Sequence, residues 1–392
     1  MPLHDEPAIA ALFETIAQEA PDRPALVMAE TVYSYGMLLA LAKAFAIKLA
    51  AAGVDSSATI QLETRDLPVV MASLLASAAL GARLAENAVV GELLGARPVT
   101  QRLFTAPRAQ PPASGQTVLI DASWSPAEVL PQADTRLART QGATDAPWLL
   151  LATSGTTGLP KVVGLSQRLV LRRSMAVSDE FVAGKTRFAS LFSYDCRPFF
   201  ARAMAALLNG ATIVDRGDWP FWIASGVNRV SGSLKQVKSL GIDGDADRKI
   251  AVVEVSGAKI SEAEALNLLR YFDLVDDTYG ATETSKSFSN LLSRALDGTL
   301  RKTGAPRDSL VEIVDADGKP VGPMQTGEIR VRNSYCVTAY LFNQSGEMAA
   351  LKDDYFYPGD IGRFAENGTL EIIARAGRDV LNFDGVKLNA GV

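Results

Sequence analysis

The sequence has very little histidine and cysteine, and this limits the chemistry that it can perform. Among 392 residues there is one histidine, His4, and there are two cysteines, Cys196 and Cys336. The cysteines are far apart and form no CxxC pair, which argues against a zinc site or a disulfide framework. The single histidine argues against histidine triads and histidine metal sites. Catalysis must therefore use lysine, carboxylates, hydroxyls, backbone amides or a metal that arrives with a substrate.

An excess of basic residues and a long apolar run are also absent. Lysine and arginine number 39 against 44 acidic residues, a formal net charge of −5 that argues against a nucleic-acid partner. The most apolar stretch, Val69–Leu84, is interrupted by polar residues and is too short to cross a bilayer. The first residues, Met1–Ile16, lack the basic start and apolar run of a signal peptide. We therefore expect a cytoplasmic protein with no membrane partner.

Strand and helix patterns alternate along most of the chain. Ala58–Leu62 is typical of a strand, Pro68–Leu80 of a buried helix ended by Gly81, Trp148–Ala152 of a buried strand and Ser261–Phe272 of a helix. Such alternation favours an α/β layered fold. From Leu310 onward, polar and apolar residues alternate between glycine turns, which predicts antiparallel β-structure.

A glycine-rich segment, TSGTTGLPK at 153–161, directly follows the Trp148–Ala152 strand. Gly155 and Gly158 allow the backbone to turn tightly and to direct its amides toward an anion. The hydroxyl groups of the segment and its lysine add donors and positive charge. The Walker pattern GxxxxGK[ST] is absent. The segment therefore predicts a loop that wraps a polyphosphate, in preference to a polar surface turn.

This segment resembles the phosphate loop of the adenylate-forming superfamily, which includes acyl- and aryl-CoA synthetases, nonribosomal-peptide adenylation domains and luciferases. Four further segments resemble motifs of that superfamily in the same order. They are Tyr279–Thr284 (YGATET), Gly327–Ile329 (GEI), Tyr357–Asp360 (YPGD, one residue shorter than usual) and the hinge-like Arg375–Lys387. The resemblance covers nearly the whole chain.

The resemblance implies a large domain of two α/β subdomains and a smaller antiparallel β-subdomain, without the C-terminal lid domain. We expect these parts at 1–145, 146–305 and 306–375, with a hinge and the start of a truncated lid at 376–392. Either the sequence is a piece of a longer chain or the protein has lost its lid. The first is favoured because Gly385–Leu388 is similar to the opening of a lid.

The resemblance also implies an activity. The chain would use ATP and Mg²⁺ to convert a carboxylic acid to an acyl-adenylate with release of pyrophosphate, and would then form a thioester with coenzyme A. One alternative is a stand-alone adenylation enzyme that loads an amino or aryl acid onto a carrier protein. Another is a lidless nucleotide-binding protein without full turnover.

The resemblance assigns nucleotide-binding roles to matching positions. The groups that would hold the β- and γ-phosphates are Thr153, Ser154, Gly155, Thr156, Thr157, Gly158 and Lys161. Thr282 would contact the α-phosphate and Glu283 would hold Mg²⁺; with Lys161 these are the expected catalytic residues. The adenosine contacts would be Gly257, Ala258, Asp277 (adenine amino group), Tyr279 (stacking), Gly280 and Asp360 (ribose hydroxyls).

Some assignments stay open. The ribose-contacting arginine of the hinge is either Arg375 or Arg378, because the segment slips by one residue against the usual pattern. The acid would lie near Ser256, Gly257, Asp195 and Arg197. Asp195 would pair with a substrate amine or Arg197 with a second carboxylate; alternatively, Asp195 pairs locally with Arg197 or caps the helix that begins before Pro198.

Overall fold

The computed structural model describes the residues 6–86, 90, 101–104, 116–129, 137, 145–154, 160–242, 248–342, 350–375, 380–383 and 386–389. The chain divides into two compact units, which are described one at a time. Unit 1 comprises Met1–Thr186, Ser193–Asp215 and Ala339–Gly346. Unit 2 comprises Arg187–Phe192, Arg216–Thr338 and Glu347–Val392.

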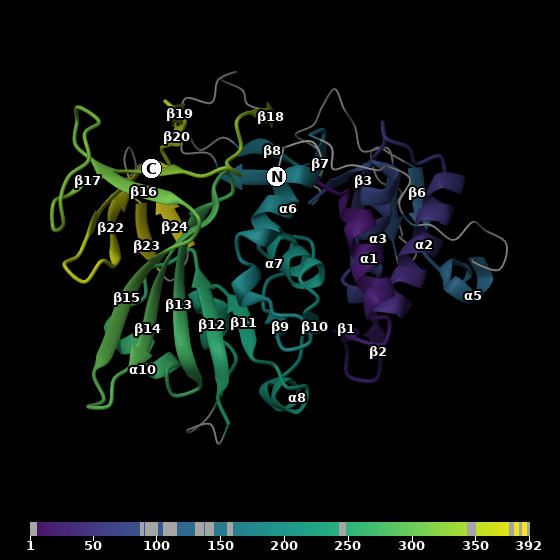
Figure 1. Ribbon diagram of the computed structural model, residues 1–392, viewed down its shortest axis with the longest axis horizontal. Coiled ribbons are helices and arrows are strands. Elements are labelled where there is room, and N and C mark those ends of the chain that lie inside the picture. Colours follow the sequence, from purple (N-terminus) through teal and green to yellow (C-terminus); the bar gives the residue numbers. More distant parts are fainter. Residues whose placement is uncertain are drawn as a thin grey trace. The chain divides into compact units, whose positions relative to one another are not determined.

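Unit 1 contains a seven-stranded sheet with the order β18-β8-β7-β4-β3-β5-β6 (Figure 1). Its central strands run parallel, and β8 and β18 extend one edge in antiparallel fashion. The strands are β3 (Thr59–Glu63), β4 (Arg83–Ala85), β5 (Gln101–Phe104), β6 (Gln116–Leu119), β7 (Pro147–Ser154), β8 (Pro160–Ser166) and β18 (Tyr340–Phe342). Three further strands of this unit, β10 (Thr212–Val214), β1 (Pro24–Val27) and β2 (Val32–Ser34), are neighbours in the order β10-β1-β2.

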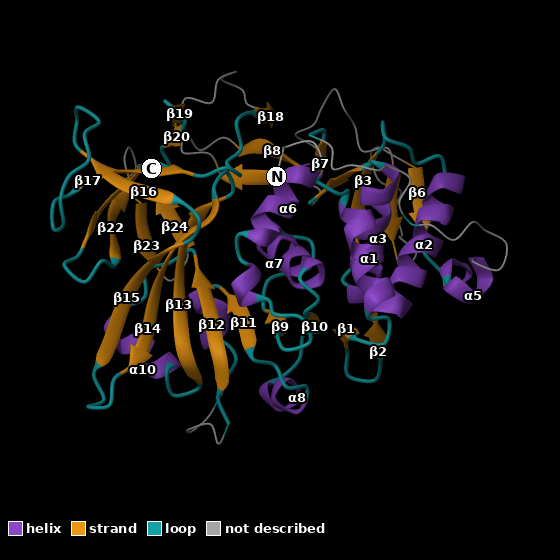
Figure 2. Cartoon of the chain, viewed as in Figure 1, coloured by secondary structure: helices purple, strands orange, loops and turns teal. Residues whose placement is uncertain are grey.

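The helices of unit 1 cover these strands. They are α1 (Ile9–Glu19), α2 (Tyr35–Ala51), α3 (Leu67–Leu80), α5 (Pro126–Val129), α6 (Gln167–Met175) and α7 (Arg197–Leu208), and the first three pack against one another (Figure 2). Helix α3 begins where Asp66 accepts the Val69 N–H at 3.1 Å. It ends at Gly81, whose φ of +71° lies in the left-handed region that favours glycine. Nearly every residue of α3 is buried, which explains its apolar composition.

Most of the apolar stretch Val69–Leu84 lies in helix α3, which is buried. Among the residues that the structure describes, no helix combines the length and apolar character needed to cross a bilayer.

Unit 2 contains a sheet in the order β15-β14-β13-β12-β11-β9, whose long strands lie side by side in Figure 1. Strands β9 (Arg187–Ser190), β11 (Arg229–Gly232), β12 (Ile250–Ser256) and β13 (Phe272–Ala281) are parallel. Strands β14 (Ser285–Arg294) and β15 (Leu300–Pro306) continue the sheet in antiparallel fashion. The helices of this unit are α8 (Trp219–Ala224), α9 (Leu234–Lys238) and α10 (Glu262–Leu268).

A second sheet in unit 2 is entirely antiparallel. It runs β19-β20-β17-β21-β22, and β16 also pairs with β17. The strands are β16 (Leu310–Val314), β17 (Gly327–Arg332), β19 (Leu351–Lys352), β20 (Tyr355–Phe356), β21 (Asp360–Phe364) and β22 (Leu370–Arg375). Its core gathers Ile313, Ile329, Val331 and Leu370. Beyond it, β23 (Val380–Phe383) and β24 (Val386–Asn389) form a hairpin.

The predicted fold class is confirmed, but two elements differ in length: the strand expected over Trp148–Ala152 extends over Pro147–Ser154, and one helix is shorter than expected. The helix expected over Ser261–Phe272 ends at Leu268, because Phe272 is already the first residue of β13 and pairs with Ile250 of β12. Its start agrees with prediction: Ser261 and Glu264 form a capping box.

Candidate active site

The predicted adenosine-binding positions of unit 2 gather at the carboxyl ends of two parallel strands. Ser256 ends β12 and lies opposite Thr278 of β13. Gly257 follows with a φ of +87°, and a Cβ added there would meet no atom within 4 Å. A backbone that turns away from the sheet into open space suits a group that lies flat along it.

The turn between β13 and β14 is tightly constrained. A Cβ on Gly280 would lie 2.0 Å from the carbonyl oxygen of Ser285, so only glycine fits. The Ala281 N–H donates to the Thr284 hydroxyl at 3.2 Å, and the Glu283 carbonyl accepts the Val337 N–H at 2.9 Å. Glu283 is only 7% exposed. Glu283 is therefore buried in this turn and is not a solvated loop residue.

Tyr279 and Asp360 come from distant segments and meet through a hydrogen bond. The Tyr279 hydroxyl donates to Asp360 Oδ2 at 2.9 Å, across 81 positions of sequence. Gly359, with φ +76°, turns the chain directly before Asp360. Arg375 is the register partner of Asp360 on the neighbouring strand β22. Two of the five motifs are thus in direct contact.

Asp277 is half-buried on β13, one register step before Ser256 and Thr278. Burial raises the pKa of Asp277 to about 7, with a further upward contribution from Asp276 and opposing ones from Asn290, Lys302 and Lys259. The carboxyl group therefore changes its charge near neutral pH.

This raised pKa predicts a pH-dependent stability. Below the ordinary carboxyl pKa the group is neutral in both states. As pH rises from there to about 7, the unfolded state loses its proton while the folded state keeps it, so stability falls; above about 7 the decline levels off. Asp277→Asn should remove this decline and be about 1–2 kcal/mol more stable than the parent at pH 8. One pKa unit corresponds to ~1.4 kcal/mol, and the predicted difference in stability is smaller than the full shift would give because solvent screens a partly exposed group. Urea unfolding from pH 4.5 to 8.5 tests it; parallel stability curves for both proteins would contradict the assignment.

In unit 1, β7 and β8 form the hairpin that flanks the glycine-rich segment. Thr153 pairs in register with Lys161. Thr153 is 8% exposed, and within the described structure its buried hydroxyl oxygen has no hydrogen-bond partner. The Lys161 ammonium lies 4.8 Å from the centre of the Tyr340 ring on β18. An orphaned hydroxyl beside a lysine is what a polyphosphate would satisfy.

Several predicted positions lie outside what the structure describes. These are Gly155, Thr156, Thr157, Gly158 and Arg378, together with the side chains of Ser154 and Arg375.

The start of α7 carries the candidate substrate residues. The helix begins at Arg197, and its N-cap residue is Cys196. Asp195 is one residue too early, so the reading of Asp195 as the helix cap is wrong. Both Asp195 and Arg197 are half-buried.

Sequence reasoning missed Glu86, which directly follows β4 and is 6% exposed. Its Oε1 accepts the Arg197 N–H at 2.7 Å, and its Oε2 accepts the Ala152 N–H at 2.9 Å. Burial raises the pKa of Glu86, while these two N–H groups and Arg197 act against the rise. The sequence feature that could have indicated Glu86 is a single carboxylate directly after the short strand Arg83–Ala85.

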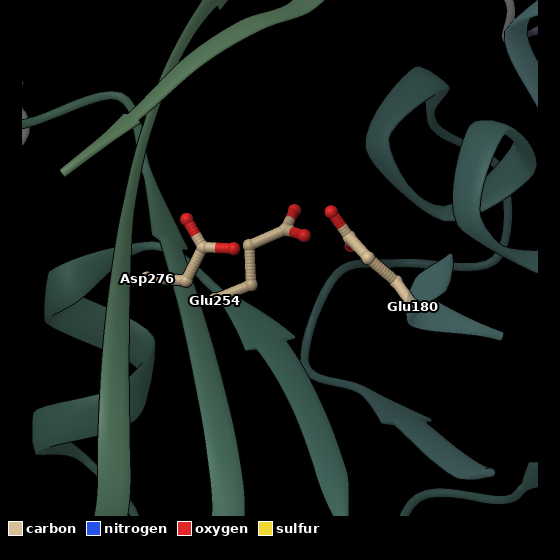
Figure 3. A group of neighbouring side chains, drawn as sticks. All are labelled: Glu180, Glu254 and Asp276. Carbon is tan, nitrogen blue, oxygen red and sulfur yellow. The ribbon is translucent and has the colours of Figure 1, made fainter. Parts of the chain in front are cut away.

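Sequence reasoning also missed a buried charge cluster inside the unit 2 sheet. Glu254 and Asp276 are register partners on β12 and β13 and lie side by side in Figure 3. The Lys286 ammonium lies 2.6 Å from Asp276 and 3.3 Å from Glu254. Burial would raise the pKa of Asp276, but the Lys286 ammonium outweighs burial and lowers it. The lysine therefore compensates these carboxylates within the fold.

Comparisons with known proteins show what this chain is similar to. Residues 95–341 match the model of a family described as AMP-binding enzyme. A salicyl-AMP ligase/salicyl-S-ArCP synthetase of Mycobacterium tuberculosis is 24% identical over 67% of this chain and 50% of its own, so the chain spans about half of that relative. A sulfoacetate–CoA ligase of Cupriavidus necator is 26% identical over 94% of this chain and 78% of its own.

Solved structures share the fold. An o-succinylbenzoate CoA synthetase of Bacillus subtilis superimposes with a TM-score of 0.79 at 19% identity, covering 98% of this chain and 81% of that one.

Proposed function

Since this chain belongs to the AMP-binding enzyme family of the adenylate-forming superfamily, we propose that it activates a carboxylic acid with ATP. The products are an acyl-adenylate and pyrophosphate, and a thioester with coenzyme A then forms. The observation that supports this most is the contact between Tyr279 and Asp360 beside the ends of β12 and β13. It joins an aromatic ring, which can stack on adenine, to a carboxylate, whose two oxygens suit a vicinal diol.

The residues present fit a nucleotide. Asp360 accepts the ribose hydroxyls, Tyr279 stacks on adenine, and Asp277 accepts the adenine amino group. Ser256, Gly257, Ala258 and Gly280 line the open backbone at the strand ends. Arg375 is favoured over Arg378 as the ribose-contacting arginine, because it is the register partner of Asp360.

In unit 1, Lys161 and the Thr153 hydroxyl hold the β- and γ-phosphates, together with the glycine-rich segment Ser154–Gly158. The buried Thr153 hydroxyl, which has no hydrogen-bond partner among the described residues, supports this role. The attack of a carboxylate on the α-phosphorus needs positioning and charge stabilisation more than covalent help from the protein. Lysine and hydroxyl donors supply both.

Thr282 and Glu283 act at the α-phosphate and the metal. A carboxylate beside hydroxyl groups is the oxygen donor chemistry that Mg²⁺ prefers, and Glu283 lies in a fixed turn with Thr284. Mg²⁺ brought by ATP would draw charge away from the phosphates. Glu283 is the residue that would hold it.

The acid and the acceptor decide between two versions of the function. An amine on the acid favours Asp195 as its partner, and a second carboxylate favours Arg197. Coenzyme A is the first candidate acceptor and a carrier protein the second.

ATP–pyrophosphate exchange with pooled fatty, aromatic and amino acids tests the activation. Measuring AMP release in the presence of coenzyme A, and separately in the presence of a carrier protein, then tests which thiol is the acceptor. ATP binding without exchange in any pool would favour a nucleotide-binding protein without turnover.

Lys161→Ala should separate the phosphate contacts from the adenosine contacts. Loss of a charge-assisted contact to the β- and γ-phosphates predicts an ATP affinity lower by about tenfold to a hundredfold. The AMP affinity should change less than about twofold, because AMP lacks those phosphates. Calorimetry with both nucleotides measures this. Equal losses for ATP and AMP, or no loss, would remove Lys161 from the phosphate site.

A further inference from the structure

Glu86 replaces part of the backbone ladder between β4 and β7. Ala85 pairs with Leu150, and the Glu86 N–H donates to the Leu150 carbonyl at 2.9 Å. The next N–H of β7, that of Ala152, bonds to the Glu86 carboxylate at 2.9 Å. In a continued parallel ladder, a backbone carbonyl would take that N–H. The side chain therefore satisfies β7 where β4 ends.

The same carboxylate binds the first turn of α7. The Arg197 N–H is at the start of the helix, where no backbone acceptor of the helix itself is available, and it donates to Glu86 Oε1 at 2.7 Å. The helix has no side-chain cap of its own at Cys196. A negative charge at this end also interacts favourably with the helix dipole. Glu86 thus holds β7 and α7 together with one buried carboxylate.

The point of attachment lies next to the phosphate-binding residues. Ala152 directly precedes Thr153, and Thr153 is the register partner of Lys161. On the other side, Arg197 is itself a candidate for binding the acid. A shift of the β7 end against α7 would therefore move Thr153 and Lys161 relative to the start of the helix.

From this geometry we propose that Glu86 is a positioning residue: it fixes the end of the β7–β8 hairpin against α7 so that Thr153 and Lys161 are placed for the β- and γ-phosphates of ATP. The proposal rests on the proposed function. None of the five motifs and none of the predicted positions includes Glu86, and its effect is exerted through main-chain hydrogen bonds rather than by contact with the nucleotide.

Glu86→Gln tests it, because glutamine keeps the shape but puts an NH₂ group, a donor, against one of the two N–H groups. ATP affinity should fall about tenfold, equivalent to ~1.4 kcal/mol, while AMP affinity changes less than about twofold. In a Lys161→Ala background the same substitution should lower ATP affinity by less than about twofold, since coupled residues are not additive. A purely structural role would lower the affinities for ATP and AMP alike.

Glu14→Gln is the matched control. Glu14 is another largely buried carboxylate of unit 1; it pairs with Lys43 at 2.8 Å and accepts the Leu137 N–H. Its substitution should leave the ratio of ATP to AMP affinity unchanged. Thermal unfolding of both variants establishes that they are folded at the temperature of the titrations. Should Glu86→Gln not fold, Glu86→Asp, which keeps the charge and withdraws it by one methylene, replaces it with the same expected ratio.

The outcomes are distinguishable. A parent chain that binds neither nucleotide overturns the proposed function and this inference with it. A parent chain that binds both, with an unchanged ratio in the folded Glu86 variant, overturns the positioning role alone. Additive losses in the Glu86→Gln/Lys161→Ala double variant overturn the placement of Lys161 by Glu86, because the two residues would then act independently.

Discussion

Asp360→Ala is expected to abolish measurable binding of both ATP and AMP. The carboxylate would accept both ribose hydroxyls, and each hydrogen bond to a charged group contributes about 1.5–3 kcal/mol. Loss of both predicts an affinity lower by about two to four orders of magnitude. Because ribose is common to ATP and AMP, the loss should be similar for the two nucleotides, unlike that of Lys161→Ala.

Calorimetry of the parent and variant with ATP and with 2′,3′-dideoxy-ATP measures the effect. The parent should bind the dideoxy nucleotide far more weakly than ATP, whereas the variant should hardly discriminate between them. Glu371→Ala is the control: Glu371 lies on the adjacent strand β22 and pairs with Arg363 at 2.7 Å in a partly exposed ion pair, which contributes little to stability. Unaltered ATP affinity in Asp360→Ala would remove Asp360 from the ribose site.

Glu283→Ala should remove most of the effect of Mg²⁺ on ATP binding and turnover. In the parent, affinity for ATP should rise with Mg²⁺ concentration, because the ion joins the carboxylate to the phosphates. Acid-dependent pyrophosphate exchange should fall about a thousandfold, a loss of several kcal/mol of transition-state stabilisation. AMP binding without Mg²⁺ should change little.

Magnesium titrations of ATP affinity check this prediction. Glu312→Ala serves as control, because Glu312 is also a carboxylate of unit 2 but pairs with Arg330 at 2.8 Å in the antiparallel sheet. The control should keep the magnesium response of the parent. An unchanged response in Glu283→Ala would mean that Glu283 does not hold the metal.

Local sequence signals predict the secondary elements of this chain well where they agree with the tertiary environment. Asp66 and Gly81 mark the two ends of α3 because a side-chain cap and a left-handed glycine act within a few residues. The end of α10 was misplaced because pairing of Phe272 with Ile250 of β12, a contact between distant segments, decides where the helix stops.

The residues of the candidate site also divide into those that a local sequence pattern indicates and those that only the fold reveals. The motif residues Tyr279 and Asp360 could be found from their local patterns, but their hydrogen bond depends on the fold. Glu86 and Lys286 belong to no local pattern, and their importance comes from partners on other strands and helices. Asp195 was one candidate for the helix cap because capping statistics favour aspartate, but the N-cap residue is Cys196 and Glu86 supplies the acceptor from a distant segment.

The central claim is that this chain forms and binds an acyl-adenylate. Non-hydrolysable acyl-sulfamoyl adenosines, which mimic that intermediate, test it most directly. Calorimetry should compare AMP with fatty, aryl and aminoacyl members of that series. We expect one class to bind at least about a hundredfold more tightly than AMP, since mimics of a reaction intermediate exceed substrates in affinity. Affinities no better than that of AMP across all classes, or no binding of any, would contradict the proposed acid activation.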